Sequence, residues 1–289
     1  MMKIILSRKG FDSKNGKVAS PILPSGVLCS LPIPDVENPK GRNSKRYEEI
    51  MVGNESMGKI VSDLTKGKIK PTDYPHFDPD LNANSIPRKP QWKGVFGQAS
   101  AAQTHLRNQG VKQGNVFLFF GWFKEVECVN GFYRHISGAP DRHVMFGWLQ
   151  VERRIPETQL SQIPDWASDH PHCRNVKREV DSVYIASDKF TIRQNDIGLP
   201  GFGVFPRFTS LLCLTASRHS RKWWSLPRWF YPATRKSSLS YHSDLTRWQL
   251  EDDAVLLKSA DIGQEFVLDC DDFPEAIDWL GEIMKVASG

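Results

Sequence analysis

Apolar positions along the chain form several runs of strand length. The longest are nearly continuous, at residues 116–123 and 143–151, and this pattern is typical of buried strands that pair with one another. Shorter runs predict further strands at residues 3–7, 182–186, 210–215 and 265–270. Residues 21–31 resemble a hairpin, with Pro24, Ser25 and Gly26 in its turn.

Helical periodicity is weaker. We expect a helix within residues 44–64, although Gly53 and Gly58 weaken it, and a second over residues 98–107 that ends before Gly110. A third should begin near Asp271 or Asp272. Many short strands with few helices favour an α+β, mostly β architecture over a parallel array of alternating strands and helices.

Glycine spacing argues against nucleotide-cofactor chemistry. The segment Gly201-Phe202-Gly203 lacks the third glycine of a dinucleotide-binding loop and has no helical continuation. Rossmann and P-loop functions are therefore disfavoured.

Charge is unevenly distributed over the 289 residues. The net charge of +5 divides into +14 for residues 1–250 and −9 for residues 251–289, where 11 acidic side chains face only 2 lysines. A basic body can attract a polyanion, while the acidic C-terminal strand and helix pack elsewhere, compete for that surface or recruit other proteins. Basic side chains spread over solvated faces would give the same totals.

Part of the basic excess is concentrated between residues 218 and 236, where no acidic residue occurs and aromatic residues are interleaved. Such a segment suits the phosphates and stacked bases of nucleic acid. We expect the following residues to contact nucleic acid: Arg218, Arg221, Lys222, Arg228, Arg235 and Lys236.

The five cysteines are far apart and form no CxxC pair, which favours free thiols in a reducing compartment. No signal peptide or apolar stretch of membrane-spanning length is present, so we predict a cytoplasmic protein without a membrane partner.

The turn Lys112-Gln113-Gly114-Asn115 precedes one apolar strand, and Val144 to Val151 forms the later one. This arrangement resembles the core of PUA-like barrels of the ASCH and EVE type. The resemblance implies a β-barrel core at about residues 95–215, elaborated by N-terminal and C-terminal elements into one domain of residues 1–289.

A second resemblance extends over most of the chain. Its segments include residues 4–13, the Phe77-Asp78-Pro79-Asp80-Leu81 run, residues 117–123, His170-Pro171-His172 and residues 224–230. Together they resemble the bacterial nucleotide modification associated domain family, type three. That resemblance implies a role in DNA base hypermodification, with modified DNA and other proteins of a modification gene cluster as partners.

One hypermodification system of this kind converts the nitrile of 7-cyano-7-deazaguanine in DNA to an amide. The resemblance implies that this chain is an enzyme hydrating that nitrile to 7-amido-7-deazaguanine. The alternative is a non-catalytic reader, because PUA-like barrels bind modified bases without altering them.

Nitrile hydration requires a base that activates water and a donor that protonates the imidate nitrogen. Asp12 follows a strand end beside Arg8 and Lys9, although a loop aspartate can simply cap a turn. Asp78 and Asp80 could share one face of an extended segment or satisfy their own turn. Cys29 is a poor nucleophile candidate, since an isolated strand cysteine is usually a core residue.

Histidines supply the remaining catalytic candidates, namely His143, His170 and His172, with burial in the core as the ordinary alternative. His170-Pro171-His172-Cys173 has no standard zinc spacing, so we predict no metal and no cofactor. A base flipped into a pocket needs flat side chains and edge contacts. We expect these from Phe96, Trp122, Trp148 and Gln98, although strand aromatics are more often core residues. Arg8 and Lys9 are further candidates for contacting the substrate.

Overall fold

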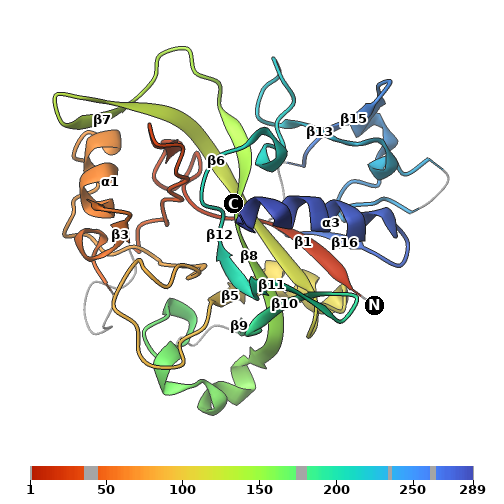
Figure 1. Cartoon of the computed structure of the whole chain (residues 1–289), viewed down its shortest axis with the longest axis horizontal. Helices are drawn as coiled ribbons and strands as arrows, with labels where there is room; N and C mark the ends of the chain where they lie inside the picture. The colour runs from red at the N-terminus through yellow and green to blue at the C-terminus, as the bar shows by residue number, and fades with distance from the viewer. Residues whose placement is uncertain (1, 36–44, 174–180, 234–235, 261–264, 289) are drawn as a thin grey trace.

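A computed structural model describes residues 2–35, 45–173, 181–233, 236–260 and 265–288 (Figure 1). Its largest element is a sheet whose main path runs in the order β16-β1-β6-β8-β9-β5. The path strands are β1 (Lys3–Arg8), β5 (Val95–Ala99), β6 (Val116–Val129), β8 (Arg142–Pro156), β9 (Asp181–Ala186) and β16 (Glu265–Asp269).

Strand β1 lies between β16 and β6 in this path. It runs parallel to β6, with Ile4 opposite Val116, and antiparallel to β16, with Ile4 opposite Leu268. Ile4, Ile5 and Leu6 are fully buried. A strand buried on both faces reads as a continuous apolar run, which is why β1 and β6 lack alternation.

Shorter strands extend the framework. Strands β2 (Ser20–Ile22) and β7 (Phe132–His135) pair with β6, and β12 (Phe202–Val204) pairs with β8. Three small sheets stand apart. They are β3 (Met51–Val52) with β4 (Glu55–Ser56), β10 (Lys189–Ile192) with β11 (Asn195–Pro200), and β13 (Trp223–Pro227), β15 (Ala254–Lys258) and β14 (Trp248–Leu250).

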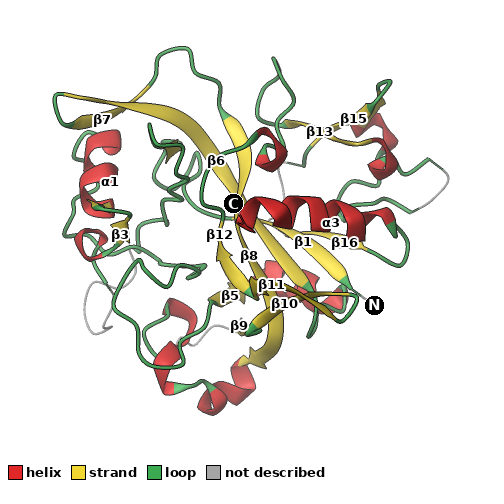
Figure 2. Cartoon of the chain, viewed as in Figure 1, coloured by secondary structure: helices red, strands yellow, loops and turns green. Residues whose placement is uncertain are grey.

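Three α-helices are present in the described residues, α1 (Met57–Thr65), α2 (Ser100–Asn108) and α3 (Glu275–Lys285), with short 3-10 helices in the loops (Figure 2). The 3-10 helices are η1 (Tyr47–Glu49), η2 (Glu157–Gln162), η3 (Asp165–Ala167), η4 (Pro171–Cys173), η5 (Ser210–Leu212), η6 (Arg228–Phe230), η7 (Leu245–Arg247) and η8 (Val286–Ser288). The predicted α+β class is confirmed.

Most predicted strands are present, but two expectations were wrong. Residues 210–215 form η5 and isolated bridges at Cys213 and Thr215 in place of a strand. Within residues 45–64 the single predicted helix divides into η1, the β3–β4 hairpin and α1. Gly53 has φ +61° in the hairpin turn, where a residue without Cβ is favoured. Ser44 lies outside the described residues.

The expected β-barrel is a further correction. The path of the main sheet ends at β16 on one side and β5 on the other, so the described strands form no closed barrel. The sheet also contains β1 and β16, which lie before and after the predicted core of residues 95–215 in the sequence. The core is therefore built from both ends of the chain. The PUA-like resemblance rests on one turn and two strands. Such local features do not specify how a sheet ends.

The acidic C-terminal segment is built into the fold. Strand β16 pairs with β1, and β15 is the central strand of the β13-β15-β14 sheet. Helix α3 packs through Trp279 against Trp229 and Phe230. These two residues belong to the basic aromatic segment, the stretch between residues 218 and 236 described above. Residues 251–289 therefore pair and pack with the basic body at several places. No helix in the described part of the chain is long and apolar enough to cross a membrane.

Candidate functional site

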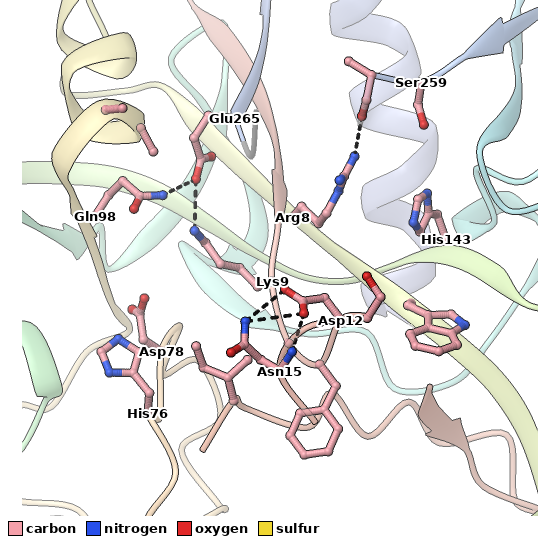
Figure 3. Close-up of a pocket in the computed structure, with 18 of the residues that line it drawn as sticks. Arg8, Lys9, Asp12, Asn15, His76, Asp78, Gln98, His143, Ser259 and Glu265 are labelled. Carbon is pink, nitrogen blue, oxygen red and sulfur yellow. Dashed lines mark hydrogen bonds and ion pairs between the residues drawn. The ribbon is translucent and has the colours of Figure 1, made fainter. Parts of the chain in front are cut away.

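A pocket of about 850 Å³ opens beside the end of β1. Its wall combines the β1 end and the loop after it, the β5–α2 junction, the first residue of β16 and part of η4. Of the predicted site residues, the structure brings the following to this wall: Arg8, Lys9, Asp12, Asp78, Gln98, Trp122, His143, His172, Arg221 and Lys222. Figure 3 shows many of these side chains around the same space.

On one side of the pocket lies a cluster of His76, Asp78 and His172. The Nε2 atoms of His76 and His172 are 3.1 Å apart, and His172 Nε2 lies 3.8 Å from Asp78 Oδ2. All three side chains line the pocket. Potential donor atoms from the three residues lie within 4.8 Å of one another. Two imidazole nitrogens and a carboxylate oxygen therefore converge on one place.

A second layer of polar contacts holds this cluster. The Nδ1 atom of His172 lies 2.9 Å from Asp181 Oδ1, and both side chains are buried. His170 Nε2 lies 3.0 Å from Asp78 Oδ1, which also accepts a hydrogen bond of 2.8 Å from the backbone amide of Gly97. Asp78 and His172 thus each have a partner behind them.

Gly97 in β5 leaves the space that His172 occupies. A Cβ atom at this position would stand 2.1 Å from His172 Cγ, far closer than two carbon atoms can approach without a bond. The same residue donates its amide proton to Asp78. The missing side chain allows the imidazole to lie directly against the strand.

Asp78 is ionised in this environment. Burial by itself raises the pKa of its carboxyl group, but the hydrogen bond from His170 and the charges of His170, His172 and His76 outweigh burial. The pKa of Asp78 is consequently held well below its ordinary value. A buried anion facing histidines is suited to binding a cation or holding a proton donor.

Glu265, the first residue of β16, forms another part of the wall. Its side chain is 1% exposed, and Oε1 accepts from Lys9 Nζ at 3.0 Å and from Gln98 Nε2 at 2.5 Å. The other oxygen, Oε2, is buried and has no hydrogen-bond partner in the described part of the chain. A buried carboxylate oxygen without a partner is costly unless something supplies a donor.

His143 is a neutral imidazole near the start of β8. Its Nδ1 atom accepts a hydrogen bond of 3.0 Å from Trp224 Nε1, so the ring proton belongs on Nε2. Burial, assisted by the positive charges of Arg8 and Arg221, lowers the pKa of His143 well below its ordinary value. The ring can therefore donate a hydrogen bond without becoming charged.

Trp122 contributes a flat surface from β6. Its Nε1 atom donates to Asp141 Oδ1 at 2.6 Å, and the Arg221 guanidinium lies 4.1 Å from the ring centroid. A guanidinium over an indole face is a cation–π contact. The predicted basic residue and the predicted stacking residue are thus neighbours.

Two predicted aspartates have other partners. Asp12 Oδ1 accepts from the backbone amides of Lys14 and Asn15, each at 2.6 Å, so Asp12 caps its own loop although it lines the pocket. Asp80 lies outside the pocket and forms two bonds of 2.6 Å with the Arg88 guanidinium. Burial raises the pKa of Asp80 although Arg88 opposes this effect. Asp78 and Asp80 are engaged separately rather than as a carboxylate pair.

Three other candidates do not line the pocket. His170 is buried behind Asp78. Phe96 is fully buried and packs on Phe117 and Phe119. Trp148 is buried, with its Nε1 atom donating to the Pro200 carbonyl. Phe96 and Trp148 are therefore core residues, as aromatic side chains in strands usually are.

The basic aromatic segment divides in the structure. Arg221 and Lys222 line the pocket, whereas Arg228 donates to the carbonyls of Glu251 and Asp252. Arg218 and Lys236 are exposed and away from the pocket wall, and Arg235 lies outside the described residues. Trp224 and Phe230 are fully buried, so these two rings pack in the core.

Sequence reasoning missed His76, Asp181 and Glu265. His76 stands two residues before Asp78, and this pairing of histidine with carboxylate was the available signal. No local signal pointed to Asp181 or Glu265, because both residues reach the site only through strand pairing. Cys29 is buried, and burial raises the pKa of its thiol to about 12, which disfavours a thiolate nucleophile.

Comparison with known proteins places this pocket within one family. Neither curated proteins nor solved structures gave a match. A family model described as nucleotide modification associated domain 3 matches residues 3–269, a range that contains every pocket residue described above. The chain therefore belongs to the nucleotide modification associated domain 3 family.

Proposed function

We propose that this protein is a DNA base-modifying enzyme that takes a guanine-type base into the pocket and hydrates the nitrile of 7-cyano-7-deazaguanine to an amide. The observation that carries the proposal is the combination in one pocket of a buried carboxylate, Glu265, with the His76–Asp78–His172 cluster. The first suits recognition of a base, and the second suits activation of water.

Glu265 matches the edge of a guanine-type base. Guanine and its 7-deaza analogues present N1–H and a 2-amino group, both hydrogen-bond donors, on the edge that a flipped base shows to a pocket. The unpartnered Oε2 atom of Glu265 is an acceptor, while Lys9 and Gln98 hold Oε1. Adenine and cytosine present an unprotonated ring nitrogen beside a single amino donor on this edge, so they offer a carboxylate one donor group where a guanine-type base offers two.

The reaction adds one water across a carbon–nitrogen triple bond. The water oxygen bonds to the nitrile carbon, one water proton leaves to a base, and the nitrogen receives a proton to form an imidic acid that rearranges to the amide. The cluster of His76, Asp78 and His172 supplies the groups that activate water. His143, with its proton on Nε2, supplies a hydrogen bond to the developing imidate nitrogen.

The pocket rim suits a nucleic-acid substrate. Arg8, Arg221 and Lys222 bring positive charge to the wall, where they can meet phosphates next to the extruded base. Trp122 adds a ring beside Arg221 on which a base can stack. DNA carrying a modified guanine is therefore the proposed partner, together with other proteins of a modification gene cluster.

Mass spectrometry of nucleosides tests the activity. Incubation with DNA containing 7-cyano-7-deazaguanine should convert the nitrile to the amide, a mass gain of one water. Asp78→Asn should abolish conversion and retain DNA binding, and Asp188→Asn serves as a control because Asp188 is exposed and outside this pocket. An unchanged nitrile at stoichiometric protein contradicts the proposal.

Turnover measured together with binding distinguishes the enzyme from a reader of modified bases, because the unpartnered acceptor on Glu265 would serve either function. Glu265→Gln should weaken binding of modified DNA about tenfold to a hundredfold, since one oxygen acceptor becomes an amide donor. A reader shows this loss of affinity with no turnover in the unsubstituted protein.

A further inference from the structure

We infer that His76, Asp78 and His172 form a binding site for one divalent first-row transition-metal ion, of the zinc or ferrous class. Two imidazoles and one carboxylate are the ligand set of catalytic zinc sites and of non-haem iron sites, both of which keep positions open for water or substrate. Metal binding does not depend on which base is modified. Its part in water activation rests on the proposed function.

The spacing of the donor atoms fits an ion. Metal–ligand bonds of about 2.1 Å place neighbouring ligands about 3.0–3.4 Å apart in octahedral or tetrahedral geometry. The His76 and His172 Nε2 atoms are 3.1 Å apart. His172 Nε2 lies 3.8 Å from Asp78 Oδ2, and all three donor atoms lie within 4.8 Å of one another, so metal binding requires the carboxylate to move inward.

The tautomer of His172 supports the same conclusion. Asp181 lies 2.9 Å from Nδ1 and therefore holds the ring proton there, which leaves a lone pair on Nε2 directed toward His76. A ligating histidine in proteins almost always gives its other ring N–H to a carboxylate or carbonyl group. Asp181 occupies that position.

Asp78 carries the same signature. One of its oxygens receives the Gly97 amide at 2.8 Å and lies 3.0 Å from His170, whereas the other is the one nearer His172. Outer partners that orient a ligating carboxylate leave its second oxygen for the ion. The contacts of Asp181 with His172, and of Gly97 and His170 with Asp78, thus leave His172 Nε2 and Asp78 Oδ2 as the donor atoms on the side of His76.

The location gives the ion access to substrate. All three ligands line the 850 Å³ pocket that also contains Glu265 and His143. A water bound at an open position of such an ion loses its proton far more readily than bulk water does. The bound metal would then activate the water. The two imidazoles, which are in direct contact, would move apart to admit the ion.

Equilibrium binding of metal alone tests the site. Protein without a histidine tag, stripped with EDTA and titrated with Zn²⁺ or Fe²⁺ under anaerobic conditions, should bind one ion per chain. Co²⁺ should give visible ligand-field absorption of an imidazole and carboxylate site. His76→Ala and His172→Ala should weaken binding at least a hundredfold, and Asp181→Asn about tenfold to a hundredfold.

His219→Ala is the matched control, because His219 is exposed and bonds locally to the Ser217 carbonyl, and it should bind metal fully. Circular dichroism establishes that each variant is folded, and His76→Gln or His172→Gln replaces the corresponding alanine variant if it is not. Binding below one ion per chain, or unaltered binding by folded His172 variants, overturns the site.

The metal result and the activity result separate the two proposals. Stoichiometric metal with an unchanged nitrile contradicts the proposed reaction and leaves the site standing. Full nitrile conversion by EDTA-stripped protein contradicts the metal's role in water activation and leaves the proposed reaction standing.

Discussion

The carboxylate of Asp181 lies 2.9 Å from Nδ1 of His172 and thereby determines which nitrogen of that ring faces His76 and Asp78. Asp181 opens β9, whereas His172 belongs to η4. The imidazole in the pocket is oriented by a residue that itself does not line the pocket.

Asp181→Asn should lower turnover about tenfold to a hundredfold with little change in KM, because an amide can present either its oxygen or its nitrogen to the imidazole and no longer fixes the tautomer. Steady-state kinetics on modified DNA provide the measurement. Asp188→Asn makes the same chemical change at an exposed site and should leave kcat unaltered. A fall in both variants would indicate a nonspecific effect of charge.

Gly97→Ala should disrupt the site while the rest of the protein remains folded. The new Cβ would stand 2.1 Å from His172 Cγ, so the imidazole must leave its place. Gly281→Ala is the contrasting variant, since a Cβ added at Gly281 in α3 meets nothing within 4 Å beyond its chain neighbours and the local helix backbone, and alanine favours helix by about 1 kcal/mol. We expect lost activity in the first variant and a raised Tm in the second. Equal activity in both would refute the proposed position of His172.

Arg88→Ala should destabilise the protein by about 3–5 kcal/mol. The substitution leaves the buried Asp80 carboxylate without the guanidinium that bonds both of its oxygens. Urea unfolding provides the free energy. Lys45→Ala removes a lysine from an exposed pair with Glu49 and should change stability by no more than about 0.5 kcal/mol.

Lys222→Ala should weaken DNA binding. It should also reduce the slope of log K against log salt concentration by about one, as expected for a lost phosphate contact. Lys222 lines the pocket rim, whereas Arg228 donates to the carbonyls of Glu251 and Asp252 away from it. Arg228→Ala should therefore retain the salt slope. Fluorescence anisotropy at several salt concentrations measures both, and equal slopes for the two variants would reject the assigned DNA path.

His242 should make stability depend on pH. Burial lowers its pKa to about 4, the hydrogen bond from its Nδ1 to the Ser240 carbonyl opposes this, and the charges of Arg247 and Arg8 add to it. Between pH 6.5 and 4 the unfolded chain binds a proton that the folded chain does not. The contribution of His242 to the free energy of unfolding is complete above about pH 6.5 and declines, by up to about 3 kcal/mol, as the pH falls toward about 4.

Urea unfolding at about pH 7.5 and about pH 5 tests this difference, with His242→Gln as the comparison. The glutamine variant should show a smaller loss of stability between the two pH values, whatever its absolute stability. An unchanged pH dependence would exclude His242 as a contributor.

Local apolar pattern was enough to predict β1, β6, β8, β9 and β16, because a strand buried on both faces needs a continuous apolar run wherever it pairs. The charge division between residues 1–250 and 251–289 was also a property of sequence alone. It did not reveal that β16 carries Glu265 from the acidic segment into the basic pocket.

Residue type, a place beside a predicted strand and membership of the family-like segments were likewise enough to select Asp78, His172, Gln98 and His143, all of which line one pocket. What only the tertiary structure decided is which partner each receives. Asp12 and Asp80 look as reactive as Asp78 in the sequence, but the loop backbone holds one oxygen of Asp12 and the Arg88 guanidinium holds both oxygens of Asp80. The decisive contacts join residues far apart in the sequence, as His76 and His172 or Lys9 and Glu265 do, and such contacts depend on strand pairing that no local pattern encodes.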